Sequence, residues 1–257
     1  MSDELLWAYG VVAAGAAPPA DLVGVAGGVV APVATAGLQA LVSSVPQAQF
    51  AAEPLRGHLN DLPWLERIAR EHEAVLERLL AEATVVPLRL CTIFEDTGGV
   101  ELMLEREHDA LAEALGRLEG RQEWGVKVLL DRDRPAPAGE AAHDEGGLAY
   151  LARRRSQLAA REEARGLAGQ LADQVDGALR VVAIDAVRLP AQNRELSRHE
   201  GDMVLNAAYL IGDPAELGAC VDALQERYAA QGARIDLTGP WPPYNFVTSA
   251  AAEQQPA

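Results

Sequence analysis

The second half of the chain alternates between strand-like and helix-like hydrophobic periods, and this pattern restricts the possible folds more than any other feature. Strands are expected at 123–130, 181–189, 202–212 and 233–237, and helices at 148–179 and after Asp213-Pro214. The resulting order, β-α-β-β-α-β, is that of a ferredoxin-like split βαβ unit. We therefore expect an α+β domain of this modified ferredoxin-like kind over residues 121–248, with a disordered tail at 249–257.

The first half predicts a separate N-terminal α+β domain over residues 1–120. Strands are expected at 5–12, at 85–94 and as a pair within 29–45 that turns at Ala36-Gly37. Asn60 and Asp61 before Pro63 are a helix-start signal, and apolar residues at helical spacing continue to about residue 82. A second helical stripe covers 104–118. Two α+β domains in 257 residues agree with ordinary domain sizes.

The charge of the chain argues against nucleic acid and membrane partners. It carries 22 Lys and Arg against 38 Asp and Glu, a net charge of −16. Residues 1–120 have a net charge of −11 and residues 121–257 a net charge of −5, so neither half is basic. Nucleic acids and anionic lipid surfaces both need a basic face on the protein.

Localisation in the cytoplasm is expected from the N-terminus and the cysteines. The chain begins with Met1-Ser2-Asp3-Glu4, unlike the basic start of a signal peptide, and lacks an unbroken apolar run of about 20 residues. Cys91 and Cys220 are isolated from one another, which suits a reducing compartment.

None of the residue patterns that could support catalysis is complete. The only lysine, Lys127, lies in a strand and not in a phosphate-binding loop. Glu105 and His108 have the spacing of a metal-ligand pair, but the second such pair in the chain falls in a Pro/Gly-rich loop. We therefore expect no catalytic residues, no cofactor and no metal, and a binding or assembly role in place of an enzymatic one.

Several segments, in order along nearly the whole chain, resemble the gas vesicle protein F/L family (GvpF/GvpL), whose members are accessory proteins of gas vesicle formation. The run that starts at Gly239 is the most specific of them, and Cys91 stands where the family leads us to expect glycine. The similar segments are LLWAYGVV at 5–12, HEAVLE at 72–77, VVPLRLCTIF at 85–94, EWGVKV at 123–128, NAAYL at 206–210 and LTGPWPPYNFV at 237–247.

The resemblance implies two α+β domains and no catalysis. It implies an assembly factor that contacts the small hydrophobic shell protein, GvpA, and other gas vesicle accessory proteins. A shell subunit that must face gas is prone to aggregate before it polymerises, so a chaperone-like partner is physically sensible. A minor structural component retained in the finished shell is the alternative, and an uncharacterised enzyme is a second one.

Two groups of residues are candidates for binding the partner. Arg154 and Arg155 lie in an arginine-rich part of the long helix, which is either a solvated face or a dock for an acidic partner. Trp241, Tyr244 and Phe246 lie among prolines that cannot belong to a central strand. We expect the three rings to pack on a neighbouring surface, the protein's own core being favoured over a partner.

Overall fold

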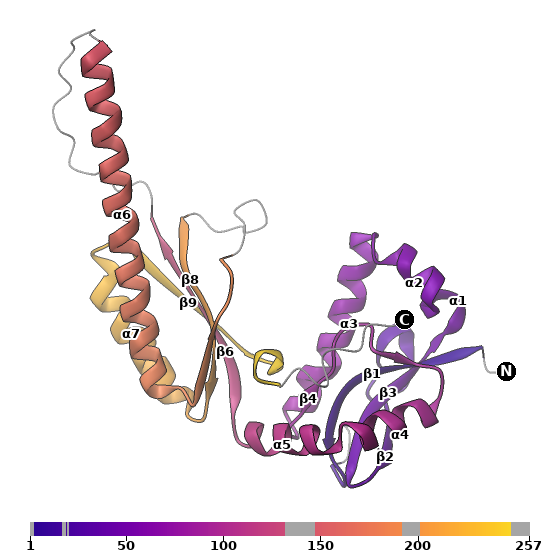
Figure 1. Ribbon diagram of the computed structural model, residues 1–257. Coiled ribbons are helices and arrows are strands. Elements are labelled where there is room, and N and C mark those ends of the chain that lie inside the picture. Colours follow the sequence, from indigo (N-terminus) through magenta and orange to yellow (C-terminus); the bar gives the residue numbers. More distant parts are fainter. Residues whose placement is uncertain (1–2, 17–18, 20, 132–146, 192–200, 248–257) are drawn as a thin grey trace. The chain divides into compact units, whose positions relative to one another are not determined.

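The computed structural model describes residues 3–16, 19, 21–131, 147–191 and 201–247 (Figure 1). The chain forms two compact units, the first of Met1–Gln122 with Trp241–Ala257 and the second of Glu123–Pro240. The sequence placed residues 241–248 in the second domain, whereas the structure groups the chain from Trp241 onward with the first unit. The proposed disordered tail, 249–257, lies outside the described residues.

A five-stranded sheet forms the centre of the first unit. Four strands follow the order β2-β3-β1-β4, and β5 also pairs with β1. Their bounds are β1 Glu4–Ala13, β2 Ala31–Thr35, β3 Leu38–Pro46, β4 Val86–Pro87 and β5 Ile93–Phe94. Ala36 and Gly37 both have positive φ, 52° and 82°, as a two-residue hairpin turn requires, so the turn predicted there is present.

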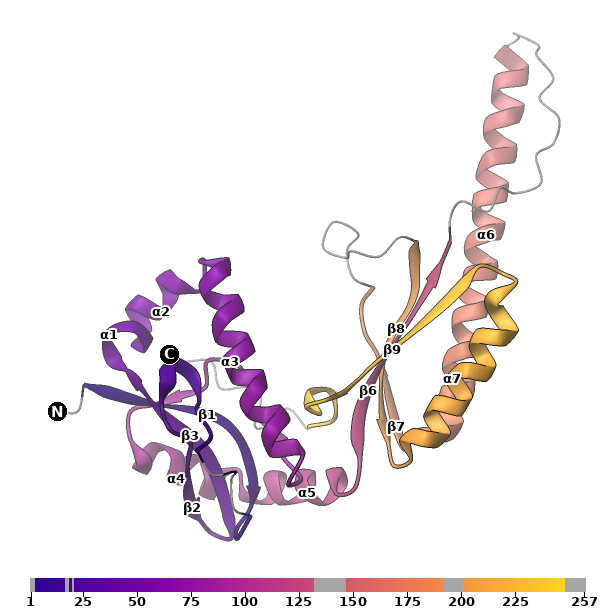
Figure 2. The same cartoon turned by 180° about the vertical axis from the view of Figure 1, so that it is seen from behind.

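Helices cover both faces of this sheet (Figures 1 and 2). One face carries α3, and α4 and α5 lie along the other. Asp61 begins α3 where the sequence predicted, because its side chain accepts a hydrogen bond from the Trp64 amide at 3.3 Å. The helices are α1 Gln47–Phe50, α2 Ala52–His58, α3 Leu62–Leu80, α4 Thr97–Arg106 and α5 His108–Leu118, with the 3₁₀ turns η1 Val25–Gly27 and η2 Tyr244–Phe246.

Two predicted elements of the first unit are interrupted. The strand expected at 85–94 is only the short β4 and β5, because Cys91 between them has a φ of 66° and the Thr92 hydroxyl donates to the Arg89 carbonyl at 2.7 Å. A left-handed backbone explains why glycine would suit position 91. The single helical stripe at 104–118 is divided between α4 and α5, which meet at Glu107.

The second unit has the predicted element order, β-α-β-β-α-β. Its elements are β6 Gln122–Leu130, α6 Gly147–Val182, β7 Asp185–Arg188, β8 Asp202–Ile211, α7 Pro214–Ala229 and β9 Ala233–Trp241, and the sheet order is β7-β8-β6-β9. The helices α6 and α7 pack with the sheet around one hydrophobic core. Asp213 begins α7 by accepting from the Ala215 amide at 2.9 Å. Pro240 lies in β9, which is an edge strand as its proline requires.

The long helix α6 has 36 residues and passes through Gly166 and Gly169 without interruption. It also runs on to Val182, which shortens the strand expected at 181–189 to β7. Its C-terminal part packs in the core through Leu171, Val175 and Leu179. None of the helices in the described part of the chain combines the length and the apolar character needed to cross a membrane.

Candidate functional site

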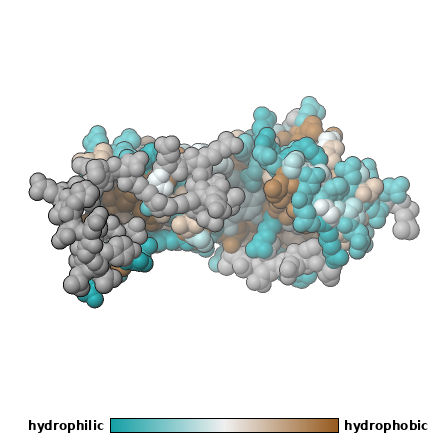
Figure 3. Space-filling model, turned by 90° about the horizontal axis from the view of Figure 1, so that it is seen from above, coloured by the Kyte–Doolittle hydropathy of each residue, from teal (hydrophilic) through white to brown (hydrophobic). Residues whose placement is uncertain are grey.

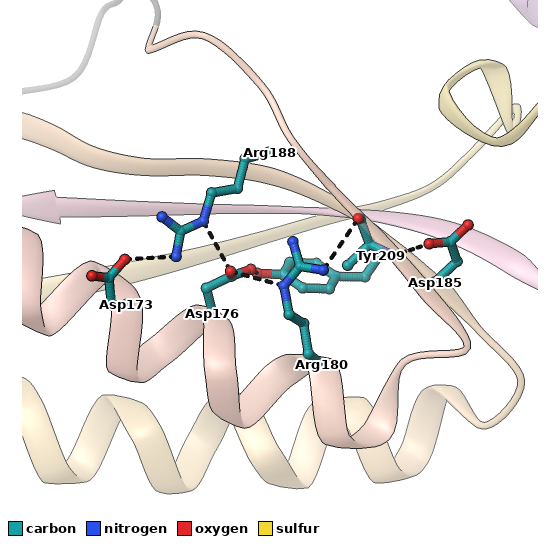
Figure 4. A network of polar contacts seen from close by, with 7 residues as sticks. Asp173, Asp176, Arg180, Asp185, Arg188 and Tyr209 are labelled. Carbon is teal, nitrogen blue, oxygen red and sulfur yellow. Dashed lines mark hydrogen bonds and ion pairs between the residues drawn. The ribbon is translucent and has the colours of Figure 1, made fainter.

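A group of polar contacts in the second unit centres on the buried Asp176 of α6 (Figure 4). Asp176 is 4% exposed, although it lies on the helix face that also carries Val175 and Leu179. Its carboxylate accepts from Tyr209 Oη of β8 at 2.7 Å. A buried carboxylate is unfavourable unless it is paired and hydrogen-bonded.

Two arginines complete the pairing of this carboxylate. Asp176 Oδ2 accepts from Arg180 Nε and from Arg188 Nε, each at 2.9 Å. Arg188 of β7 also donates to Asp173 at 2.8 Å, and Arg180 reaches the Ala186 carbonyl at 3.4 Å. The group therefore joins α6, β7 and β8 to one another.

The electrostatics of Asp176 indicate a stable ion pair and not a reactive acid. Burial by itself raises the pKa of the Asp176 carboxyl, but hydrogen bonds from Arg180, Tyr209 and Arg188 outweigh it, so the pKa lies below its usual value. Burial and the adjacent Asp176 carboxylate also raise the pKa of Tyr209. The carboxylate is ionised and both of its oxygens accept hydrogen bonds, which suits a structural role rather than proton transfer.

The C-terminal segment of the first unit packs against α3. Phe246 is 3% exposed and Tyr244 is half-buried, whereas Trp241 is 45% exposed. The Tyr244 hydroxyl lies 3.2 Å from His72 Nε2 and donates to Glu73 Oε1 at 3.3 Å. Tyr244 and Phe246 therefore lie against the protein's own core, whereas Trp241 is only partly buried.

His72 connects this segment to the central sheet. Trp7 Nε1 donates to His72 Nδ1 at 3.0 Å, so Nδ1 is an acceptor and the neutral ring carries its proton on Nε2, facing the Tyr244 hydroxyl. The ring also stacks on Tyr9 with centroids 5.3 Å apart. Burial lowers the pKa of the His72 imidazole from 6.5 to about 4, and a hydrogen bond with the Leu88 backbone opposes this shift.

We expect the stability of the protein to fall as the pH drops from 6.5 towards 4, partly because of His72. The unfolded chain takes up a proton on this residue in that range and the folded chain does not. With the folded pKa near 4, the loss at pH 5 is about 2 kcal/mol. Urea denaturation of the wild type and of His72→Gln between pH 5 and 8 measures it. Parallel stability curves for the two proteins would contradict the assignment to His72.

The remaining candidates from the sequence lie apart from these contacts. Arg154 and Arg155 are exposed on the N-terminal half of α6, in the second unit, whereas Trp241, Tyr244 and Phe246 belong to the first. The structure therefore does not unite the five residues in one site within either unit.

The pair Glu105 and His108 is divided between α4 and α5. Glu105 accepts from the Thr35 hydroxyl at 3.4 Å, and His108 Nδ1 lies 2.9 Å from Asp109. An open groove of about 520 Å³ lies there, lined by Ala36 and residues 105–110. Among the described residues, no three His, Cys, Asp or Glu side chains are placed to hold a metal ion.

Comparison with known proteins gives matches over nearly the whole chain. Residues 5–248 match the family model described as "Gas vesicle synthesis protein GvpL/GvpF". Gas vesicle protein L of Streptomyces sp. (strain CB03234) is 38% identical over 219 residues, which cover 82% of this chain and 80% of that protein. Gas vesicle protein F of the same strain is 27% identical over 223 residues, covering 82% and 84%. The chain is thus more similar to the L protein of that strain than to its F protein.

A solved structure shares the fold. The crystal structure of the gas vesicle protein GvpF from Anabaena sp. PCC7120 superposes with a TM-score of 0.69 at 21% identity, covering 95% of this chain and 96% of that one. This likeness extends over both units.

Proposed function

The chain belongs to the GvpL/GvpF family of gas vesicle synthesis proteins, and we propose that it acts in gas vesicle formation as an assembly factor that binds the small hydrophobic shell protein, GvpA. The match over residues 5–248 carries the proposal. A subunit with a large apolar surface aggregates unless a partner covers that surface before assembly. In this proposal the protein works in the cytoplasm, at the forming vesicle and among the other accessory proteins, and it needs no cofactor.

The roles of the buried polar groups support binding rather than catalysis. Asp176 and His72 are two of the groups that a catalytic role could use, since both are buried and both have shifted pKa values. Each of them instead joins secondary-structure elements of its own unit.

Deletion of the gene, with every other gas vesicle gene intact, tests the role. The expected result is loss of vesicles, together with co-purification of the shell protein with the tagged wild type. Normal vesicles in the deletion strain would refute it. Washing purified vesicles with denaturant separates the assembly factor from the alternative, a minor structural component. A retained shell component stays with the washed vesicles, whereas an assembly factor does not.

The exposed N-terminal half of α6 is a candidate surface for binding a second partner during gas vesicle formation. Residues 162–167 are exposed, as are Arg154 and Arg155, and Leu158 and Leu167 are 50% and 61% exposed. Two neighbouring arginines in a chain of net charge −16 are suited to dock on an acidic surface of another gas vesicle protein.

Reversal of charge at this position should weaken that contact. For Arg154→Glu with Arg155→Glu, we expect pairwise binding to the accessory partner to fall about tenfold at low salt and the difference to shrink at high salt, since exposed charges are screened. The control is Arg56→Glu with Arg78→Glu, which makes the same change of charge at exposed positions of α2 and α3. If the α6 variant and the control variant bound the partner equally well at every salt concentration, the docking role of Arg154 and Arg155 would be refuted and this part of α6 would be a solvated helix face.

A further inference from the structure

The first unit contains a long stretch without any ionisable side chain. No Asp, Glu, Lys, Arg or His occurs from Leu22 to Ala52, although 23% of the whole chain is charged. The stretch builds the turn around η1, the edge strand β2 and the central strand β3. Absence of charge is expected for β3, which is buried, but not for a turn and an edge strand at the surface.

Aliphatic side chains of this stretch point into solvent. Val23 and Val29 are 60% and 68% exposed and face each other across an isolated β-bridge. We name the exposed set the charge-free edge, and it consists of Val23, Ala26, Val29, Ala31, Pro32 and Ala34. On the face of the first unit visible at the right of Figure 3, by contrast, hydrophilic residues predominate.

The turn holds its exposed valines in a fixed conformation. The Val25 amide donates to the buried Tyr9 hydroxyl at 2.7 Å, and the Ala26 amide donates to Glu71 Oε2 at 3.1 Å. Ala26 has a φ of 55°, a left-handed conformation that costs a non-glycine residue about 1 kcal/mol or more. A Cβ atom at Gly24 would lie 2.0 Å from Tyr9 Oη, so only glycine fits this approach. The same turn buries Val25, so the exposure of Val23 and Val29 does not reflect a loose loop.

The strand β2 has an open edge. It is the last strand of its sheet and pairs with β3 alone among the described strands. Natural proteins protect such edges with charged side chains, especially lysine, or with proline. Here Pro32 is the single device of this kind, and the rest of β2 is uncharged.

We propose that the charge-free edge docks an uncharged, extended aliphatic segment of a partner protein beside β2. The proposal rests on the proposed function and commits to the small hydrophobic shell protein as the partner. The edge itself offers no counter-charge to a charged segment, and the Glu71 carboxylate beside Ala26 already accepts from the Ala26 amide and pairs with Arg67. An aliphatic segment, by contrast, gains burial against the valines. An extended segment also has hydrogen-bonding groups to share with an open strand edge.

Lysine substitutions at exposed positions test this. Val29→Lys and Ala34→Lys each introduce a charge at the charge-free edge without removing a buried contact. Leu102→Lys is the matched control, because Leu102 is 63% exposed on α4 of the same unit. With tagged protein and co-expressed shell protein, we expect at least a fivefold loss of co-purified shell protein for both edge variants and less than a twofold change for the control, with melting temperatures close to the wild type in all three.

Three outcomes would overturn the proposal, and each is distinct. Wild-type recovery of shell protein by both edge variants would refute the docking surface while leaving the proposed function standing. Failure of the wild type itself to bind shell protein would refute the proposed function as well. A wild-type dimer that the edge variants convert to monomers, with shell binding unchanged, would show that a second copy of this chain occupies the edge.

Discussion

Replacing Asp176 with alanine is expected to destabilise the second unit by about 3 kcal/mol. The substitution leaves the hydroxyl of Tyr209, a residue with no exposed surface, without its acceptor, which costs about 1–3 kcal/mol. It also removes the shared anion between Arg180 and Arg188. Both arginine side chains are 45% exposed and can be hydrated once the carboxylate is gone. The penalty for breaking a buried ion pair, about 3–5 kcal/mol, is therefore an upper bound on the loss of stability caused by Asp176→Ala.

A double-mutant cycle with Tyr209→Phe separates the parts of this effect. Tyr209→Phe removes only the hydroxyl and should cost about 1 kcal/mol. If the Asp176–Tyr209 contact is as close as its 2.7 Å distance indicates, Asp176→Ala should cost less in the Tyr209→Phe background than in the wild type. Urea denaturation of the four proteins measures the coupling, and strictly additive losses would contradict it.

The elements that the sequence predicted well are those with local signals. Asp61 and Asp213 are helix caps followed by proline, and both begin helices where their patterns indicated. The turn at Ala36-Gly37 follows from the need for positive φ at two successive residues. These features depend on neighbours within four residues, which a single sequence contains.

The breaks at Cys91 and Glu107 could not be predicted from the hydrophobic pattern, because they arise from the backbone conformation and leave that pattern unchanged. The stretch at 85–94 has the pattern of a continuous strand, but the left-handed backbone at Cys91 divides it, and a cysteine gives no warning of that conformation. The stripe at 104–118 keeps its helical spacing across Glu107, although the helix is interrupted there. Hydrophobic periodicity shows which face of a helix is apolar. It does not show where one helix ends and the next begins if the apolar face continues across the break.

The candidate site was predictable in part. His72 falls on an apolar helix stripe, which favours a core or boundary position, but its contact with Tyr244 joins residues 172 positions apart. Asp176 has a usable signal that was missed, since a carboxylate between Val175 and Leu179 on a core-facing stripe requires a buried partner. Which arginines supply that partner depends on the packing of β7 against α6, and a single sequence does not contain it.

The same long-range packing decides the effect of truncating the aromatic residues near the C-terminus. Phe246→Ala should cost about 3–5 kcal/mol, as for other buried phenylalanines, because its side chain is 3% exposed. Trp241→Ala removes a larger ring from the same run, but that ring is 45% exposed, so the substitution should cost about 1 kcal/mol or less.

The contrast between the two substitutions tests whether the C-terminal segment locks the first unit. The larger loss should follow the buried ring and not the larger ring, because the energy of a truncation depends on the contacts that the ring makes. Tyr244→Phe adds a third measurement, since it keeps the ring and removes only the hydroxyl that meets His72 and Glu73, at an expected cost of about 1 kcal/mol. Chemical denaturation of the three variants, beside co-purification of the shell protein, gives the result. If Phe246→Ala unfolded like the wild type and lost the shell protein, the segment would be a recognition element instead of a lock.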